Sequence, residues 1–540
     1  MKKIKFLAPI LAFAMFSCDQ YLDVNESPNN VSFDQITPDK LLPGAQSNTY
    51  AVQVTTMNQL GNVFMNSWAG NVQSFTGGYA KEYQLNIDNA FYNGIWDGLY
   101  RNLMNFQAII NYPNPNHQYD NYVAAAKICK AHYMQYIVDL YGDAPYSQAW
   151  QGSANTTPTY DDDFNIYKGL IAELEQARAL IAAANANAED IAEFDIMLGG
   201  DMAEWEKFAN TIELRMCLRM SEATGAVATY RDTKLAAIAA GPFVDANVTI
   251  NPGYDLSTDG HMNPSFFTFA YDSAGNLQSN RTFITMSGHA YKSLQSYATT
   301  NWPTGTTNFE VITGSGVSYP NVTDGRSARL FTGAPGQPRR AVTQGSNQVD
   351  VGLNTATFPG LPCRLGLLGT YGLNGQVING TLDEYAAADG YVMTLSESCF
   401  LQAEAAVRYP SLFTGAQTLF NTGVTSSFTL RNAAIGTYLT TINTKPNFGF
   451  TASTTTAQKL HAIMYQKWIA LMSIHGIESF IDYNRTGYPL TPLATTATQT
   501  RKPYRLIYPV SEYVANSANV PSVSTSEAFT INAKTPFWRQ

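Results

Sequence analysis

The sequence predicts a mainly α fold, and three observations support this prediction. Five long segments place apolar side chains at helical steps of three and four residues. Alanine-rich helices alternate with aromatic-rich ones, as in hairpins of helical repeats. Between about 225 and 390 the helical pattern gives way to Gly, Thr, Asn, Ser and Pro. We therefore expect a TPR-like helical hairpin scaffold, over about 40–225 and 390–490, with a long irregular, loop-rich lobe over about 225–390.

The N-terminus carries the pattern of a secreted lipoprotein. A lysine-rich start precedes apolar residues 6–16, a run much shorter than the ~20 residues of a membrane-spanning helix. Residues 1–17 are therefore predicted to be a signal peptide. Ser17 before Cys18 resembles a lipobox, which predicts cleavage before Cys18 and acylation of its thiol. The alternative is an ordinary signal peptide followed by a chance cysteine. An acylated chain would be anchored to a membrane without spanning it.

The helical segments can be placed from their periodicity. In residues 161–184 one face carries Tyr167, Leu170, Leu174, Ala177 and Ile181. Aspartates 161–163 stand at the start of that segment, where carboxylates cap free backbone amides. The other predicted helices lie within 120–143, 204–222, 392–409 and 456–476, the first ending near Gly142 and the last closing at Gly476.

The composition narrows the classes of function. The chain has 540 residues, a net charge of −9 and only 14% charged residues, with no basic stripe, so we expect no nucleic-acid partner. Its 32 Tyr and 28 Phe accompany many amide and hydroxyl side chains. Aromatic faces and amides suit sugars, although a general extracellular surface has the same composition. No linker divides the chain, so residues 18–540 are predicted to be a single domain.

The cysteines other than Cys18 show no disulfide framework. Cys129, Cys217 and Cys399 fall within helical patterns, and Cys363 lies in a loop rich in Pro and Gly. We expect buried free thiols that pack as small apolar groups.

Several motifs, in this order along the chain, resemble those of the SusD/RagB family of nutrient-binding outer-membrane lipoproteins. They are LDVNESPNN, LLPGAQ, DLYGDAPYSQAW, WEKFANTIELRMCLRMSE, SESCFLQAEAAVR, HGIESFIDYNRTGYP and RKPYRLIYPVSEYVANSANV. The likeness is greatest to the divergent second SusD-like branch. Phe480, Asn484 and the stretch DGRSARLF depart from the usual pattern, and these departures bear on the subfamily and hence on the substrate.

The resemblance implies a fold and a task. The fold would be four TPR-like hairpins with an irregular ligand-binding lobe. The task would be to capture an oligosaccharide, sometimes a peptide, at the cell surface of the outer membrane. The protein would then act as the lid of a SusC-like TonB-dependent β-barrel transporter. A second hypothesis is a TPR-type envelope scaffold lipoprotein that binds protein partners and no nutrient.

No catalytic or metal-binding constellation is found in the sequence. The six histidines show no metal-ligand spacing. Glu397 and Glu404 share a helix face, but residues seven apart start near ~10 Å, whereas retaining glycosidases hold their carboxyls about 5–5.5 Å apart. They are interpreted as structural hydrogen-bonding residues. We therefore expect no enzyme, no cofactor and no metal.

Aromatic side chains in polar loops are the candidate ligand contacts. They are Trp68, Tyr79, Tyr83, Tyr271, Trp302 and Tyr319. The alternative is that they fasten long loops to the body or face the transporter. By contrast, Trp96, Trp205 and Trp468 lie in amphipathic helices and are expected in the core, and Trp538 is expected to pin the C-terminal tail.

Overall fold

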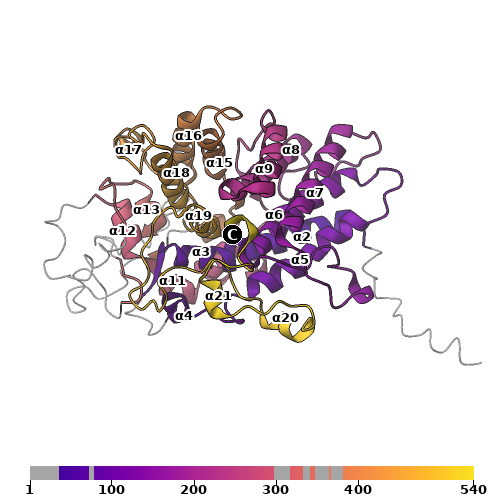
Figure 1. The fold of residues 1–540 in the computed structure, drawn as a ribbon, viewed down its shortest axis with the longest axis horizontal. Coiled ribbons are helices and arrows are strands. Elements are labelled where there is room, and N and C mark those ends of the chain that lie inside the picture. The colour runs from indigo at the N-terminus through magenta and orange to yellow at the C-terminus, as the bar shows by residue number, and fades with distance from the viewer. Residues whose placement is uncertain (1–35, 72–77, 297–316, 333–340, 347–363, 366–380) are drawn as a thin grey trace, which may run out of the picture.

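Helices make up most of the fold, so the mainly α prediction is confirmed (Figure 1). The computed structural model describes residues 36–71, 78–296, 317–332, 341–346, 364–365 and 381–540. Cys18, Trp302 and Cys363 therefore lie outside the described residues. Within the described residues, no helix combines the length and the apolar character needed to cross a bilayer.

The first half of the scaffold is a series of helices, each packed against the next. In this series α5 packs on α2 and α6, α7 on α6 and α8, and α9 on α8. A π-helical turn, Gln53–Met57, joins α2 to α3. The bounds are α2 Pro38–Val52, α3 Asn58–Phe64, α5 Gly94–Asn111, α6 Asp120–Tyr141, α7 Asp163–Ala183, α8 Met202–Arg219 and α9 Gly225–Ile238.

Local sequence explains where these helices begin and end. Asp162 caps α7, because its carboxylate accepts a hydrogen bond from the Asn165 amide at 2.9 Å. Gly142 ends α6 with a φ of +75°, a conformation that glycine adopts readily. Four of the five apolar residues predicted for one face of α7 are buried, and Ile181 is partly buried.

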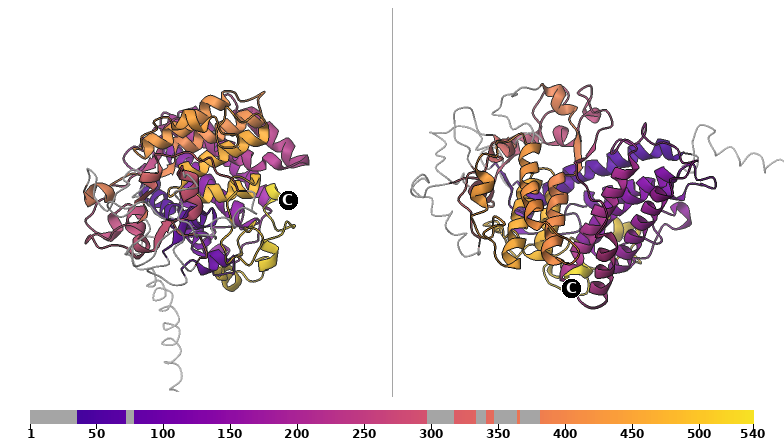
Figure 2. Two further views of the ribbon diagram at one scale, coloured as in Figure 1. Left: turned by 90° about the vertical axis from the view of Figure 1, so that its left-hand side faces the viewer. Right: turned by 90° about the horizontal axis from the view of Figure 1, so that it is seen from above.

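The second half of the scaffold is formed by the C-terminal helices. Here α15 packs on α16, α18 and also α8, and α19 packs on α18 and α3. Seen from above in Figure 2, the indigo-to-magenta helices and the orange helices form two adjacent groups. The bounds are α15 Leu395–Arg408, α16 Ala416–Leu430, α17 Tyr438–Ile442, α18 Thr456–Leu471 and α19 Gly476–Thr486.

Two predicted helix boundaries were wrong. Residues 392 and 393 belong to a strand that pairs with Val248, not to α15. Helix α18 ends at Leu471, and Gly476 begins α19 instead of closing α18. Glycine is needed at 476 because a Cβ there would lie 2.8 Å from the backbone nitrogen of Asn62.

Short elements surround this scaffold. Antiparallel pairs are formed by β1 with β3, β2 with β6, and β4 with β5. The strands are β1 Trp68–Gly70, β2 Val248–Ile250, β3 Ile284–Met286, β4 Phe331–Thr332, β5 Arg364–Leu365 and β6 Gly390–Met393. The short helices are α4 Ala80–Gln84, α10 Pro264–Phe269, α11 Ser279–Phe283, α12 Gly288–Leu294, α13 Ser327–Leu330, α14 Leu382–Ala386, α20 Val510–Ala515 and α21 Thr525–Ala528.

One large apolar core runs through both halves of the scaffold. It includes Trp96, Trp205 and Trp468, as predicted, and a smaller cluster of Phe266 and its neighbours lies apart from it. Trp538 is buried and donates its indole N–H to Asp139, which confirms that it pins the tail. The thiols of Cys129, Cys217 and Cys399 are buried and free, also as predicted.

Candidate functional site

Three aromatic rings cluster where β1, α4 and α11 meet. The Tyr79 ring lies 4.8 Å from the Phe283 ring and 5.9 Å from the Tyr83 ring. Two glycines flank Phe283 closely, since a Cβ on Gly70 or Gly78 would come within 2.8 or 2.2 Å of its ring. The Tyr83 hydroxyl accepts a hydrogen bond from the Gly70 amide at 2.8 Å. The structure thus brings together two of the predicted residues, Tyr79 and Tyr83.

Polar groups gather beside these rings. Tyr92 donates its hydroxyl hydrogen to Glu82 at 3.0 Å, and Gln59 donates an amide hydrogen to the Tyr92 oxygen at 3.0 Å. Burial raises the pKa of the Glu82 carboxyl. Burial, with the nearby Tyr92, Tyr83 and Glu82, also raises the pKa of Tyr79 well above its usual value. These groups share one poorly hydrated environment.

Two features of Tyr79 lower the stability of the folded protein. Its φ is +57°, in the left-handed region that bulky residues rarely adopt. Tyr79 is 8% exposed, and its hydroxyl has no hydrogen-bond partner among the residues that the structure describes. An unpaired buried hydroxyl costs about 1–3 kcal/mol. Strained residues and unpaired polar groups of this kind concentrate where ligands bind.

Trp68 has a different environment from the polar loop that its sequence suggested. It lies in β1 opposite Met286, is 0% exposed, and packs edge-on against Phe269 at 5.2 Å. Its indole N–H donates to the Ser473 hydroxyl at 3.0 Å. In this arrangement Trp68 fastens the β1–β3 pair to the scaffold. Ligand contact by Trp68 stays a prediction, and it would require the ring to be uncovered.

The remaining predicted aromatics lie apart from the Tyr79 cluster. Tyr271 is partly buried, with its ring 6.0 Å from that of Phe266. Tyr319 lies 3.0 Å from Nδ1 of His289, whose ring is 5.1 Å from that of Trp468. Burial, with Lys502 and Lys292 nearby, lowers the pKa of His289 to about 3. Their ligand contact also stays a prediction.

Phe283, Glu82 and Tyr92 were not identified from the sequence. Phe283 is about 200 residues from Tyr79 along the chain, and the link between Glu82 and Tyr92 spans a turn. Glu82 directly precedes Tyr83, a predicted residue, so its position in the sequence carried a signal.

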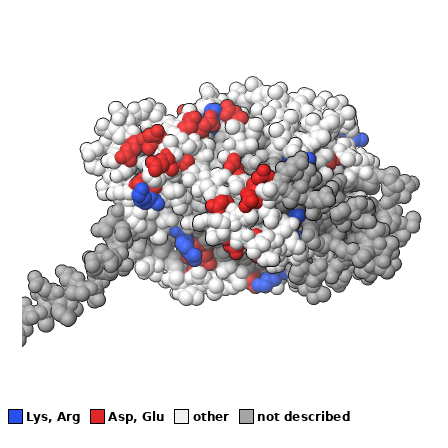
Figure 3. Space-filling model, turned by 180° about the vertical axis from the view of Figure 1, so that it is seen from behind, with Lys and Arg blue, Asp and Glu red and all other residues white. Residues whose placement is uncertain are grey.

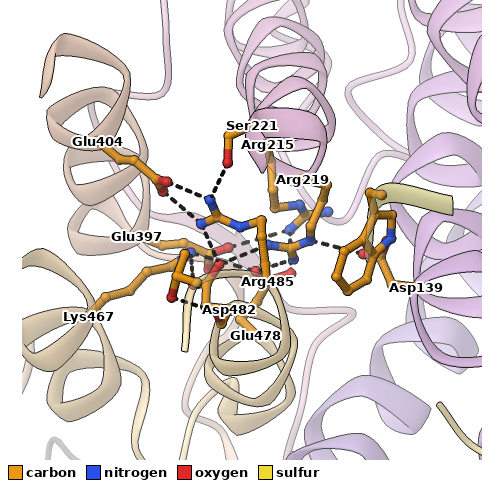
Figure 4. A network of polar contacts seen from close by, with 12 residues as sticks. Asp139, Arg215, Arg219, Ser221, Glu397, Glu404, Lys467, Glu478, Asp482 and Arg485 are labelled. Carbon is orange, nitrogen blue, oxygen red and sulfur yellow. Dashed lines mark hydrogen bonds and ion pairs between the residues drawn. The ribbon is translucent and has the colours of Figure 1, made fainter. Parts of the chain in front are cut away.

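A buried ionic network joins the two halves of the scaffold (Figure 4). Arg219 pairs with Asp139, Glu478 and Asp482, at 2.6–3.0 Å. Further pairs link α8, α15, α18 and α19 through Arg215, Glu397, Glu404, Lys467 and Arg485. Although burial alone would raise it, Arg219 and Arg215 hold the pKa of Glu478 well below its usual value. Glu397 and Glu404 therefore have the structural role that the sequence suggested, and Asp139 belongs to the same network.

Among the charged side chains on the described surface in Figure 3, acidic ones predominate. Groups of carboxylates are spread over this face, and lysines and arginines are scattered among them. This agrees with the net charge of −9. The described part of this face offers no continuous basic surface for a polyanion.

A family model described as "Starch-binding associating with outer membrane" matches residues 28–250 and 339–509. The chain belongs to this SusD-like family. Among curated proteins, none matches the sequence significantly.

Solved structures of SusD homologues share the fold of this SusD-like chain. A chitin-binding SusD homologue from Flavobacterium johnsoniae has 21% identity and a TM-score of 0.66, with 92% of this chain and 98% of that chain covered. A SusD-like protein from Bacteroides thetaiotaomicron has 20% identity and a TM-score of 0.61, with 88% of this chain and 94% of that chain covered. A SusD homologue from Bacteroides uniformis has 19% identity and a TM-score of 0.62, with 93% of this chain and 99% of that chain covered.

Proposed function

We propose that this protein is a cell-surface lipoprotein that captures an oligosaccharide and delivers it to a TonB-dependent outer-membrane transporter, acting as its lid. The family description, starch binding and association with the outer membrane, supports a carbohydrate ligand. The protein binds without transforming the ligand, and Cys18 carries the lipid anchor.

One observation supports the location of the site. The Tyr79 hydroxyl is buried and has no hydrogen-bond partner within the described part of the chain, in a strained residue whose ring contacts those of Tyr83 and Phe283. A sugar supplies what this position lacks, because its C–H face covers an aromatic ring and its hydroxyls bond a phenol. Ligand binding then offsets the cost of holding Tyr79 in this conformation.

Two experiments test the proposal. The first measures calorimetric binding of starch- and chitin-derived oligosaccharides by the mature protein and by Tyr79→Ala, which should bind at least tenfold more weakly. The second identifies what co-purifies with the protein after gentle extraction from its own membrane. A stoichiometric β-barrel supports the lid role. A soluble partner without a barrel, together with no glycan binding, would favour the envelope scaffold instead.

A further inference from the structure

The Glu82 carboxylate forms no ion pair with any of the described residues. Lys81, its neighbour in sequence, pairs instead with Asp88 at 2.7 Å. Among the described residues no lysine, arginine or histidine forms an ion pair with Glu82. One of its oxygens accepts the hydrogen of Tyr92 at 3.0 Å. Lys81 acts on this partly buried charge without forming an ion pair with it. Among the described residues the Glu82 charge therefore has no directly paired cation at the edge of the aromatic cluster.

Glu82 lies close to the aromatic cluster. Glu82 and Tyr83 are consecutive residues of α4, and Tyr79 is the residue immediately before this helix. The Glu82 charge acts on the phenols of Tyr79, Tyr83 and Tyr92, so all four groups lie within electrostatic range of one another. Tyr92, at a φ of +51°, is held in place by Gln59 and Glu82.

Aromatic rings beside a carboxylate favour a cationic group on the ligand. Aromatic faces attract cations, most strongly where water is excluded. A carboxylate accepts hydrogen bonds and cannot donate them, and it bonds most strongly to a charged donor. A neutral hydroxyl would leave the charge of Glu82 uncompensated, at a continuing desolvation cost. A protonated amine would compensate the charge and lie against the tyrosine rings.

We infer that the Tyr79 site binds a protonated amino group, and that the oligosaccharide captured there contains unacetylated amino sugars. This inference rests on the proposed function and specifies its substrate class. Glu82 is the residue that selects the amine, Tyr79 and Phe283 provide the aromatic faces, and Tyr92 with Gln59 positions the carboxylate. The net charge of −9 adds a weak long-range attraction for such a cationic oligomer.

Two probes of equal length test the inference. They are a β-1,4-linked glucosamine hexamer and its fully N-acetylated counterpart, used below the pKa of the glucosamine amine. We expect the mature protein to bind the amine form at least about tenfold more tightly, because a hydrogen bond to a charged group contributes about 1.5–3 kcal/mol. Glu82→Gln should abolish this preference, so that the variant binds the amine hexamer no more tightly than the acetylated one.

Control variants separate a local effect from a general charge effect. Glu206→Gln changes the net charge equally but lies on α8 in the scaffold, and it should keep the preference. In Glu82→Gln the amide oxygen still accepts from Tyr92, so its melting temperature should match that of the wild type. A peptide rich in lysine, as a third probe, should bind more weakly than the amine hexamer.

Each outcome bears on the inference. A preference lost only in Glu82→Gln supports it. If both hexamers bind equally, if both variants behave alike, or if the peptide binds best, it is overturned. If only starch-derived oligomers bind, the inference fails and the proposed function stands. If no oligosaccharide binds at all, both fail.

Discussion

Arg219 Nη2 in α8 lies 2.6 Å from Glu478 Oε2 in α19, and both side chains are fully buried. The first residue belongs to the N-terminal helices and the second to the C-terminal ones. Their contact is one member of a network that includes Asp139, Asp482 and Lys467 (Figure 4). The two halves of the scaffold are therefore joined by charge as well as by apolar packing.

Removing one member of this network should destabilise the fold strongly. Arg219→Met leaves Asp139, Glu478 and Asp482 with less compensation in a dry interior. We expect a loss of about 3–5 kcal/mol in the free energy of unfolding. Urea unfolding followed by circular dichroism measures it. Arg101→Met, at an exposed position on α5, should change stability by less than about 0.5 kcal/mol. Equal effects of the two variants would contradict this view of the network.

Close backbone contact between α3 and α19 leads to a second stability prediction. A Cβ on Gly61 would lie 2.1 Å from the backbone carbon of Gly476, and neither backbone can move aside easily. Gly61→Ala should therefore destabilise the protein by several kcal/mol, of the order seen for severe overpacking. Gly44→Ala, in α2 with open space around it, should instead stabilise it by about 0.5–1 kcal/mol. Thermal unfolding of both variants tests the contrast.

Sequence periodicity was sufficient to predict the helices of the scaffold, but not the boundaries that depend on contacts between helices. The apolar face of α7 follows from local steps along one helix, and so does the end of α6 at Gly142. By contrast, the start of α19 at Gly476 depends on close contact with Asn62. Asn62 is more than 400 residues away in the sequence, so no local pattern predicts this contact.

The candidate site shows the same limit. The aromatic and polar composition pointed to Tyr79 and Tyr83, but the same composition around Trp68 hid a buried strand paired with Met286. Composition cannot distinguish an aromatic residue that binds a ligand from one that holds a loop against the scaffold, because both occur as aromatic residues within polar loops. Phe283 belongs to the site only through a tertiary contact, with Tyr79.

Asp163 should make stability depend on pH. Burial and the neighbouring Asp143 raise the pKa of its carboxyl to about 7, against ~3.9 in an unfolded chain. Between these values the folded state holds a proton that the unfolded state has lost, so stability falls as pH rises from about 4 to about 7. Asp163→Asn removes this loss and can still accept the Phe537 amide hydrogen.

The expected result is a pH-dependent difference between Asp163→Asn and the wild type. The variant should match the wild type near pH 4.5 and exceed its stability by on the order of 2 kcal/mol at pH 8. Melting temperatures across this range measure the difference. A constant difference at all pH values would contradict the assignment to Asp163.

Cys18 should determine where the protein is found in the cell. If its thiol is acylated, Cys18→Ala removes the anchor, and acyl chains contribute about 0.8 kcal/mol per buried methylene. We expect the variant to move from the membrane pellet to the soluble fraction, or to stay unprocessed, and to lose labelling by a clickable fatty acid. Labelling that persists in Cys18→Ala would rule out this lipidation site.

Substitutions of Trp68 and Phe283 should distinguish a residue that holds a loop in place from one that binds the ligand. Trp68 is buried and bonded to Ser473, so Trp68→Phe loses a hydrogen bond and packing, and we expect a destabilisation of about 1–3 kcal/mol with unchanged affinity. Phe283 is partly buried beside Tyr79, so Phe283→Leu should weaken oligosaccharide binding about tenfold, with a smaller loss of stability. Calorimetric titration and urea unfolding of both variants provide the comparison. If Trp68→Phe instead lost affinity at full stability, Trp68 would be a ligand contact whose ring is uncovered on binding, and the site would extend from Tyr79 along β1.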